Sequence, residues 1–109
     1  MGALRRPTPE EEKFIAFLIK KSSKSFPDTW KKDLMVSSID VGESGSLNLF
    51  PDGKASNNRE FGDQISEYVF KDKDRVEVVA SLNIDDKGNL FELDIWKADF
   101  SDLIQFPAV

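Results

Sequence analysis

The sequence predicts an α+β fold in which an N-terminal helix, followed by a short second helix, packs on a mainly antiparallel sheet of about five strands. Two observations lead to this prediction. Apolar residues recur at helical spacing in the first part of the chain, and after Leu34 they alternate with polar residues at the period of two that strands show. A chain of 109 residues has the length of one domain, so we expect a single domain over residues 1–109.

The clearest element is a helix from about Pro9 to Ser23. Thr8 and Glu11 form a capping box, in which each side chain can bond to the backbone N–H of the other residue. Pro9 falls at the first helical position, where its missing N–H costs nothing. We expect the core to receive one apolar stripe of this helix: Phe14, Ile15, Phe17, Leu18 and Ile19.

The next segment predicts a short helical turn through Leu34. Asp28 or Thr29 could cap its first turn, and Trp30 and Leu34 would face inward. The first two strands come after it. Residues 35–41 lean to one face, residues 47–49 alternate, and Gly42–Gly45 supplies the turn between them.

The second half of the chain predicts three more strands. Residues 51–59 form the longest polar loop, and residues 65–70 suggest a third strand, with a helical turn near Gln64 as the alternative. The strongest pattern is a β-hairpin, because residues 76–84 and 91–95 alternate on either side of a turn at 85–89. Gly88 can adopt the positive φ that such a turn needs. The tail from Phe100 to Pro107 has no sustained period, and we expect it to wrap over the core.

The composition makes several classes of chemistry improbable. The chain contains no cysteine, so it has no disulfide and no thiolate metal site. It also contains no histidine, which is the commonest general base and the commonest side-chain ligand of transition metals. We therefore expect a protein that is not an enzyme and needs no cofactor. No serine has a histidine partner, which argues against a serine hydrolase. Neither the 85–88 turn nor the Gly42–Gly45 turn has the full spacing of a calcium or phosphate loop.

We expect no signal that directs the chain to a membrane. No apolar run approaches the roughly 20 residues that cross a bilayer. No apolar region follows Arg5 and Arg6, and Arg6 stands where a myristoylation signal has Ser or Thr. We expect a cytoplasmic protein without a membrane partner.

Charge is distributed unevenly along the chain. Residues 1–34 carry eight Lys and Arg against five Asp and Glu, whereas residues 35–109 carry seven against fifteen. An acidic excess repels nucleic acid and attracts basic proteins. The lysines near Phe26 and Trp30 could suggest RNA binding, but the helix dipole and solubility already explain them. We expect a basic protein partner and no nucleic acid.

One strand of the predicted hairpin carries the main candidate binding residues. Glu92, Asp94 and Trp96 alternate with apolar residues and so share a face, and Glu77 could join them from the opposite strand. This row fits a binding face with an aromatic anchor, a solvated strand face, or a carboxylate pair for acid–base or divalent-metal chemistry. If Trp96 instead closes the core under the tail, the candidates move to the acidic loops at Glu43, Asp52, Glu60 and Asp63.

Three segments resemble a group of small bacterial proteins that includes immunity proteins of toxin systems, such as contact-dependent growth inhibition. They are the opening Arg6–Glu11 with its helix, the Gly42–Leu49 segment, and the closing Gly88–Phe100 segment with Leu103 and Pro107. The resemblance implies a small cytoplasmic protein that binds and blocks a cognate toxin domain. Many such toxins are nucleases with basic grooves. The resemblance implies no catalytic motif and no transferable contact residue.

The sequence thus favours a non-enzymatic immunity protein that neutralises a basic toxin domain through an acidic surface. Two other classes stay open. One is a small carboxylate-dependent or metal-dependent enzyme that uses Glu92 and Asp94. The other is a regulatory module with an unrelated protein partner.

Overall fold

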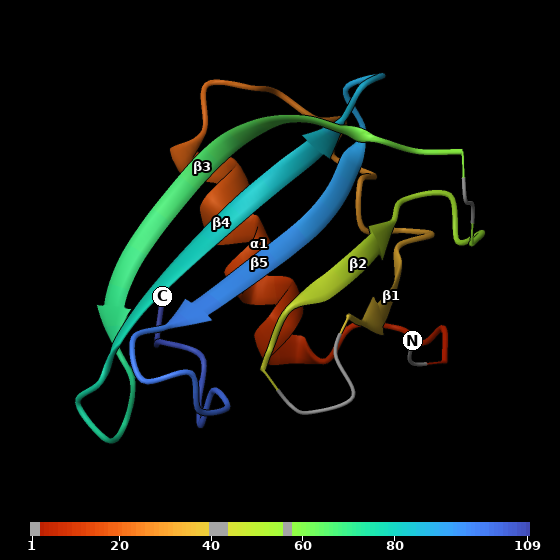
Figure 1. Ribbon diagram of the computed structural model, residues 1–109. Helices are drawn as coiled ribbons and strands as arrows, with labels where there is room; N and C mark the ends of the chain where they lie inside the picture. Colours follow the sequence, from red (N-terminus) through yellow and green to blue (C-terminus); the bar gives the residue numbers. More distant parts are fainter. Residues whose placement is uncertain (1–2, 40–43, 56–57) are drawn as a thin grey trace.

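One helix lies on one face of a five-stranded antiparallel sheet, which confirms the predicted α+β class (Figure 1). The computed structural model describes residues 3–39, 44–55 and 58–109. The strand order is β1-β2-β5-β4-β3, and every neighbouring pair is antiparallel. The elements are α1 (Pro9–Lys21), β1 (Met35–Ser38), β2 (Leu47–Phe50), β3 (Phe61–Lys71), β4 (Glu77–Asp85) and β5 (Leu90–Lys97).

The predicted capping box starts the helix. The Thr8 hydroxyl accepts from the Glu11 backbone N–H at 3.1 Å, and the Glu11 carboxylate accepts from the Thr8 N–H at 2.9 Å. The same carboxylate takes two bonds from Arg5, at 2.8 and 2.9 Å. Burial alone would raise the pKa of Glu11, but Arg5 and Thr8 outweigh it and lower that pKa below its usual value. The helix ends at Lys21, slightly before the predicted Ser23, because the backbone of Ser22 is extended.

The predicted second helix is wrong. Residues 28–31 form turns, with i→i+3 bonds from the Trp30 N–H to Pro27 and from the Lys32 N–H to Thr29. At the end of this segment, the Arg6 guanidinium donates to the backbone carbonyls of Lys31, Lys32 and Leu34 at 2.8–3.2 Å. The backbone carbonyls at the end of this segment therefore accept hydrogen bonds from an arginine that is distant in sequence, and not from a following helical turn.

The hairpin of β4 and β5 confirms the strongest strand prediction. The Asp85 carboxylate accepts from the N–H groups of Lys87 and Asn89 at 2.9 Å each, and Gly88 has a φ of 86°.

β3 begins at Phe61, earlier than the predicted residue 65. β1 ends at Ser38, and Val41 lies outside the described residues.

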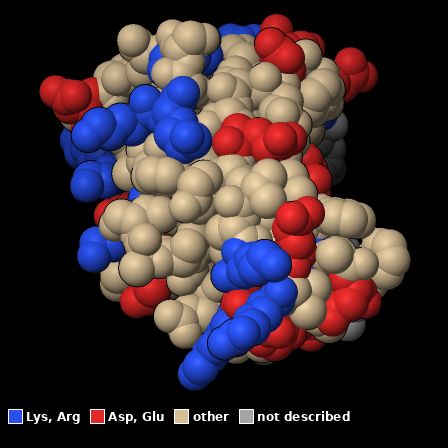
Figure 2. Space-filling model, turned by 90° about the vertical axis from the view of Figure 1, so that its left-hand side faces the viewer, with Lys and Arg blue, Asp and Glu red and all other residues tan. Residues whose placement is uncertain are grey.

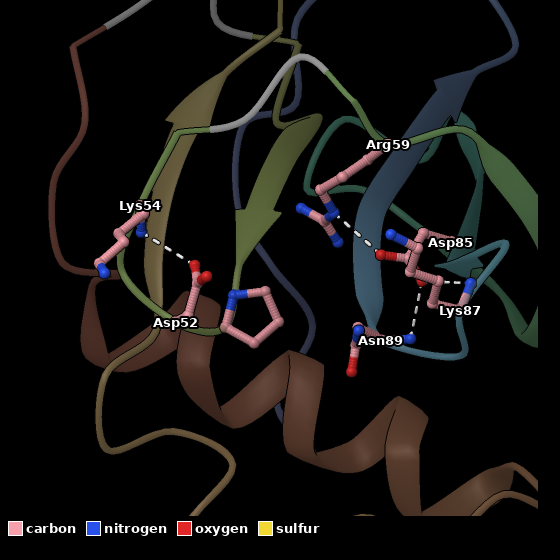
Figure 3. A pocket seen from close by; sticks show the side chains of 7 residues that line it. Asp52, Lys54, Arg59, Asp85, Lys87 and Asn89 are labelled. Carbon is pink, nitrogen blue, oxygen red and sulfur yellow. Dashed lines mark hydrogen bonds and ion pairs between the residues drawn. The ribbon is translucent and has the colours of Figure 1, made fainter.

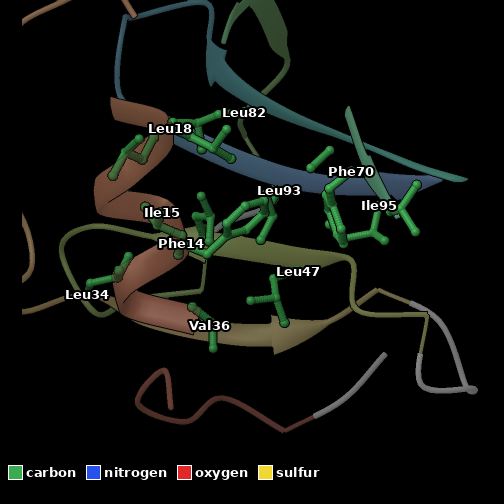
Figure 4. Packing of buried hydrophobic residues seen from close by; sticks show 14 residues of the cluster. Phe14, Ile15, Leu18, Leu34, Val36, Leu47, Phe70, Leu82, Leu93 and Ile95 are labelled. Atoms are coloured by element: carbon green, nitrogen blue, oxygen red, sulfur yellow. The ribbon is translucent and has the colours of Figure 1, made fainter. Parts of the chain in front are cut away.

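The core fills the space between α1 and the inner face of the sheet (Figure 4). Phe14, Ile15 and Leu18 of the helix are fully buried, as the stripe predicts, while Phe17 and Ile19 are partly buried at its margin. Their buried partners on the sheet and beside it include Leu34, Val36, Leu47, Leu49, Phe70, Val78, Ala80, Leu82, Leu93 and Ile95.

The C-terminal tail is fixed by apolar packing and by a buried ion pair. Phe106 lies 5.3 Å from Phe14 between ring centroids. Asp72, in the turn after β3, bonds to the Lys97 ammonium at 2.9 Å and accepts from the backbone N–H groups of Ile104 and Gln105. Burial alone would raise the pKa of Asp72, but these donors lower it below its usual value. The expectation that the tail wraps over the core is met from Leu103 onward.

Candidate functional site

The candidate site is the face of the sheet that points away from α1. Alternation along β4 and β5 sends Val78, Ala80, Leu82, Leu93 and Ile95 into the core, so the residues between them point the other way. No helix or strand of the described residues lies over that side of the sheet (Figure 1). We define the outer face as Glu67, Val69, Lys71, Glu77, Val79, Ser81, Asn83, Glu92, Asp94 and Trp96.

Cross-strand register arranges this face in rows. Asn83 stands opposite Glu92, and its side-chain amide donates to the Glu92 carboxylate at 3.0 Å. Ser81 stands opposite Asp94, and Val79 stands opposite Trp96. The four candidates of the predicted hairpin thus share one face of the sheet. Asp94 is two residues from Trp96 along β5 and Glu77 is two residues from Val79 along β4, whereas Glu92 is four residues from Trp96.

Trp96 is the largest apolar side chain of the outer face and lies near the end of β5. The residue is 47% exposed, so it does not close the core under the tail. Val79 and the 49% exposed Val69 continue the row across β4 and β3. Phe100, just after β5, is 82% exposed, and its ring lies 6.0 Å from that of Trp96 at an interplanar angle of 88°. Sequence reasoning missed Phe100, because no periodicity marks an aromatic residue in a turn.

Carboxylates surround this apolar row. Glu67, Glu77 and Asp94 are exposed and Glu92 is half-buried, while Lys71, opposite Glu77, is a basic neighbour. Asp99, next to Phe100, accepts from the Ser101 hydroxyl and N–H, which lower its pKa below the usual value. Figure 2 views the molecule from the β3 side of Figure 1. Lysine and arginine gather at the upper left and again at the lower centre, while aspartate and glutamate lie in the centre, at the right and at the top.

The other predicted acidic candidates do not join this group. Glu60 and Asp63 lie at the opposite end of the sheet, because Asp63 pairs with Ile84 whereas Trp96 pairs with Val79. Five residues along a strand correspond to about 17 Å. Asp52 lies in the loop after β2, and Glu43 is outside the described residues.

Asp52 lines a cavity of about 260 Å³ together with Pro51, Lys54, Arg59, Asp85, Lys87 and Asn89 (Figure 3). The Arg59 guanidinium bonds to the Asp85 carboxylate at 2.9 Å and to the carbonyls of Leu49 and Leu90. It also lies over the rings of Phe50 and Phe91. Burial alone would raise the pKa of Asp85, but the Asn89 N–H and Arg59 lower it. The ionic groups at the back of this cavity are therefore held by one another and serve the fold.

Two further features bear on the classes of function that the sequence leaves open. Within residues 3–39, 44–55 and 58–109, no group of three or more Asp, Glu, His or Cys side chains is placed to hold a metal ion. In the same ranges, no helix is long and apolar enough to cross a membrane.

Comparison with known proteins identifies a family. Residues 4–107 match the family model described as "Domain of unknown function (DUF6984)", so the chain belongs to this family. Searches of the curated proteins and of the solved structures each found no match.

Proposed function

We propose that this member of the DUF6984 family is a cytoplasmic binding protein that neutralises a basic protein, namely a bacterial toxin domain with nuclease activity, without itself catalysing a reaction. The observation that carries the proposal is the open outer face, where the exposed Trp96 lies among Glu67, Glu77, Glu92 and Asp94.

An exposed apolar row with a carboxylate surround matches the anatomy of protein interfaces. Binding energy concentrates in a few central side chains, tryptophan prominent among them, and polar groups at the rim exclude water from the centre. Trp96, Val79 and Val69 would supply the centre, and the outer-face carboxylates the rim. A rigid sheet holds these groups in place before binding, which reduces the entropy lost on association.

The charge of this face supports a basic partner. A nuclease binds phosphates in a positively charged groove, and an acidic protein can be drawn to that groove from a distance and occupy it. The resemblance of the opening and closing segments to immunity proteins supports the choice of a toxin. A regulatory module with another basic partner would use the same surface, and affinity capture followed by mass spectrometry distinguishes the two.

The proposal is tested by co-expression. The product of a toxin reading frame directly upstream of this gene should inhibit growth, and co-expression of this protein should restore it. Trp96→Ala should lose protection while keeping its fold, and Phe61→Ala is the matched control because Phe61 is 57% exposed at the far end of the sheet. If no product of an adjacent reading frame is neutralised, the proposal fails.

A further inference from the structure

Phe100 combines two features that rarely coincide in a structural residue. The residue is 82% exposed, and its backbone is left-handed, with a φ of 62°. The left-handed region brings Cβ of a bulky residue close to its own carbonyl oxygen, so glycine or asparagine normally occupies it. A turn after β5 holds this conformation, in which the Phe100 N–H donates to the Lys97 carbonyl at 2.9 Å. Burial of the ring does not offset the steric cost.

The ring of Phe100 stands perpendicular to that of Trp96. The interplanar angle is 88°, the centroids are 6.0 Å apart, and both rings keep large exposed areas. The two rings therefore form a corner, which we call the aromatic corner. Asp94 lies two residues before Trp96 on the same face, about 7 Å along the strand, and Asp99 precedes Phe100.

We infer that the aromatic corner binds an arginine side chain of the partner, an inference that rests on the proposed function. A guanidinium is planar and weakly hydrated, so it can stack on one ring while its N–H groups donate to nearby carboxylates. Asp94, two residues before Trp96 on the same face, and Asp99, next to Phe100, offer their carboxylates as acceptors. An apolar side chain in the same place would desolvate these carboxylates without pairing them. A lysine ammonium is more strongly hydrated and presents no flat surface to a ring.

A peptide titration tests the aromatic corner without the natural partner. The probe is hexa-arginine amide, and hexa-lysine amide is the comparison at equal charge. Amide resonances of the isotope-labelled protein should shift saturably around residues 94–101 with hexa-arginine, and hexa-lysine should bind more weakly. Phe100→Ala should weaken the binding of hexa-arginine by about two- to fivefold, the range for an exposed cation–π contact. Phe61→Ala should leave it unchanged.

A second variant separates a binding role from a structural one. Glycine adopts a positive φ without steric cost, so Phe100→Gly should keep or raise the melting temperature while weakening peptide binding as Phe100→Ala does. A lower melting temperature in Phe100→Gly than in Phe61→Gly would assign the ring to the fold and overturn the inference. Equal peptide affinities in Phe100→Ala and Phe61→Ala, or equal binding of both peptides, would also overturn it.

The outcomes keep the two proposals apart. Protection in co-expression together with unchanged peptide binding by Phe100→Ala would remove the aromatic corner and leave the proposed function standing. Arginine-selective binding that depends on Phe100, without protection against any adjacent product, would establish the corner and refute the toxin as partner.

Discussion

At the scale of single residues, Arg59 links β2 to β5 through its side chain. In the part of the chain that the structure describes, the register of β2 with β5 comprises two pairs, Leu47 with Leu93 and Asn48 with Glu92. Beyond that point, the guanidinium of Arg59 bonds to carbonyls of both strands and to Asp85. One side chain therefore takes the place of backbone bonds that the diverging strands no longer make.

Arg59→Ala should lower the free energy of unfolding by about 3 kcal/mol, because it leaves the buried Asp85 carboxylate without its charged partner. Arg59→Lys should recover only part of this loss, since an ammonium lacks the planar fork that reaches all three acceptors. Urea unfolding monitored by circular dichroism measures the effect. Lys54→Ala, an exposed residue of the same cavity, is the control, and an equal loss there would contradict this role for Arg59.

At the scale of the elements, α1 depends on its contact with the sheet. The capping box and the charged ends favour the helix locally, but Leu18 and its neighbours Phe14 and Ile15 are buried only because the sheet covers them. Most of the stability of a helix of this length comes from such packing.

Leu18→Asp should therefore unfold the protein or destabilise it by about 4 kcal/mol or more, because it places an unpaired carboxylate in the core. Lys13→Asp, at an exposed position of the same helix, should change the melting temperature little. Thermal unfolding of the two variants checks the difference. A wild-type melting temperature in Leu18→Asp would show that the stripe is not core.

Local pattern was a good guide to some elements and not to others. The capping box, the apolar stripe and the β4–β5 hairpin depend on neighbours in sequence, so the sequence alone predicted them. The segment at 28–34 depends on Arg6, which is distant in sequence, and local capping signals wrongly predicted a helix there. Alternation placed Glu92, Asp94 and Trp96 on one face. The position of Phe100 could not be predicted from the sequence, because Phe100 lies in a turn and turns show no periodic pattern of apolar residues.

At the scale of the whole molecule, the distribution of charge governs association. The acidic outer face should attract a basic partner before contact, over the 8–10 Å at which charges are screened at physiological salt. Aromatic burial acts only after docking. Charge and aromatic contacts should therefore affect different rate constants.

With an identified partner, Glu92→Gln combined with Asp94→Asn should slow association severalfold at low salt and lose that effect at high salt. Trp96→Ala should leave association nearly unchanged and speed dissociation, at a cost of about 2 kcal/mol if it is a hot spot. Surface plasmon resonance at two salt concentrations measures both rates. An association rate that is unchanged in the charge variant at low salt would exclude steering by these carboxylates.

The free energy of unfolding should depend on pH in the acidic range. Asp72, Asp85 and Glu11 have pKa values below their ordinary values of 3.8 and 4.5 in the folded protein. The unfolded chain therefore binds more protons than the folded chain as pH falls. Their stabilisation is complete above the unfolded pKa values and is lost as pH falls through the folded ones.

The urea midpoint should therefore be nearly constant between about pH 5.5 and 8, where no histidine or cysteine titrates, and should decrease below about pH 4.5. Asp85→Asn should be less stable at neutral pH and should show a shallower acid decline. A midpoint that changes as steeply between pH 6 and 8 as below pH 4.5 would contradict the assignment to these carboxylates.

The strand order has a consequence for how the chain reaches its native state. β3, β4 and β5 follow one another in sequence and pair through short turns, and β1 pairs with β2, the next strand in sequence. The junction of Leu47 with Leu93 closes a much longer loop. The chain must lose the conformational entropy of that loop before the contact stabilises the fold. We therefore expect the β3–β4–β5 meander to form early, with α1, and the β1–β2 hairpin to join late. Native-state hydrogen exchange should then find the amides of β2 opening at lower denaturant concentration than those of β4, as one subglobal unit.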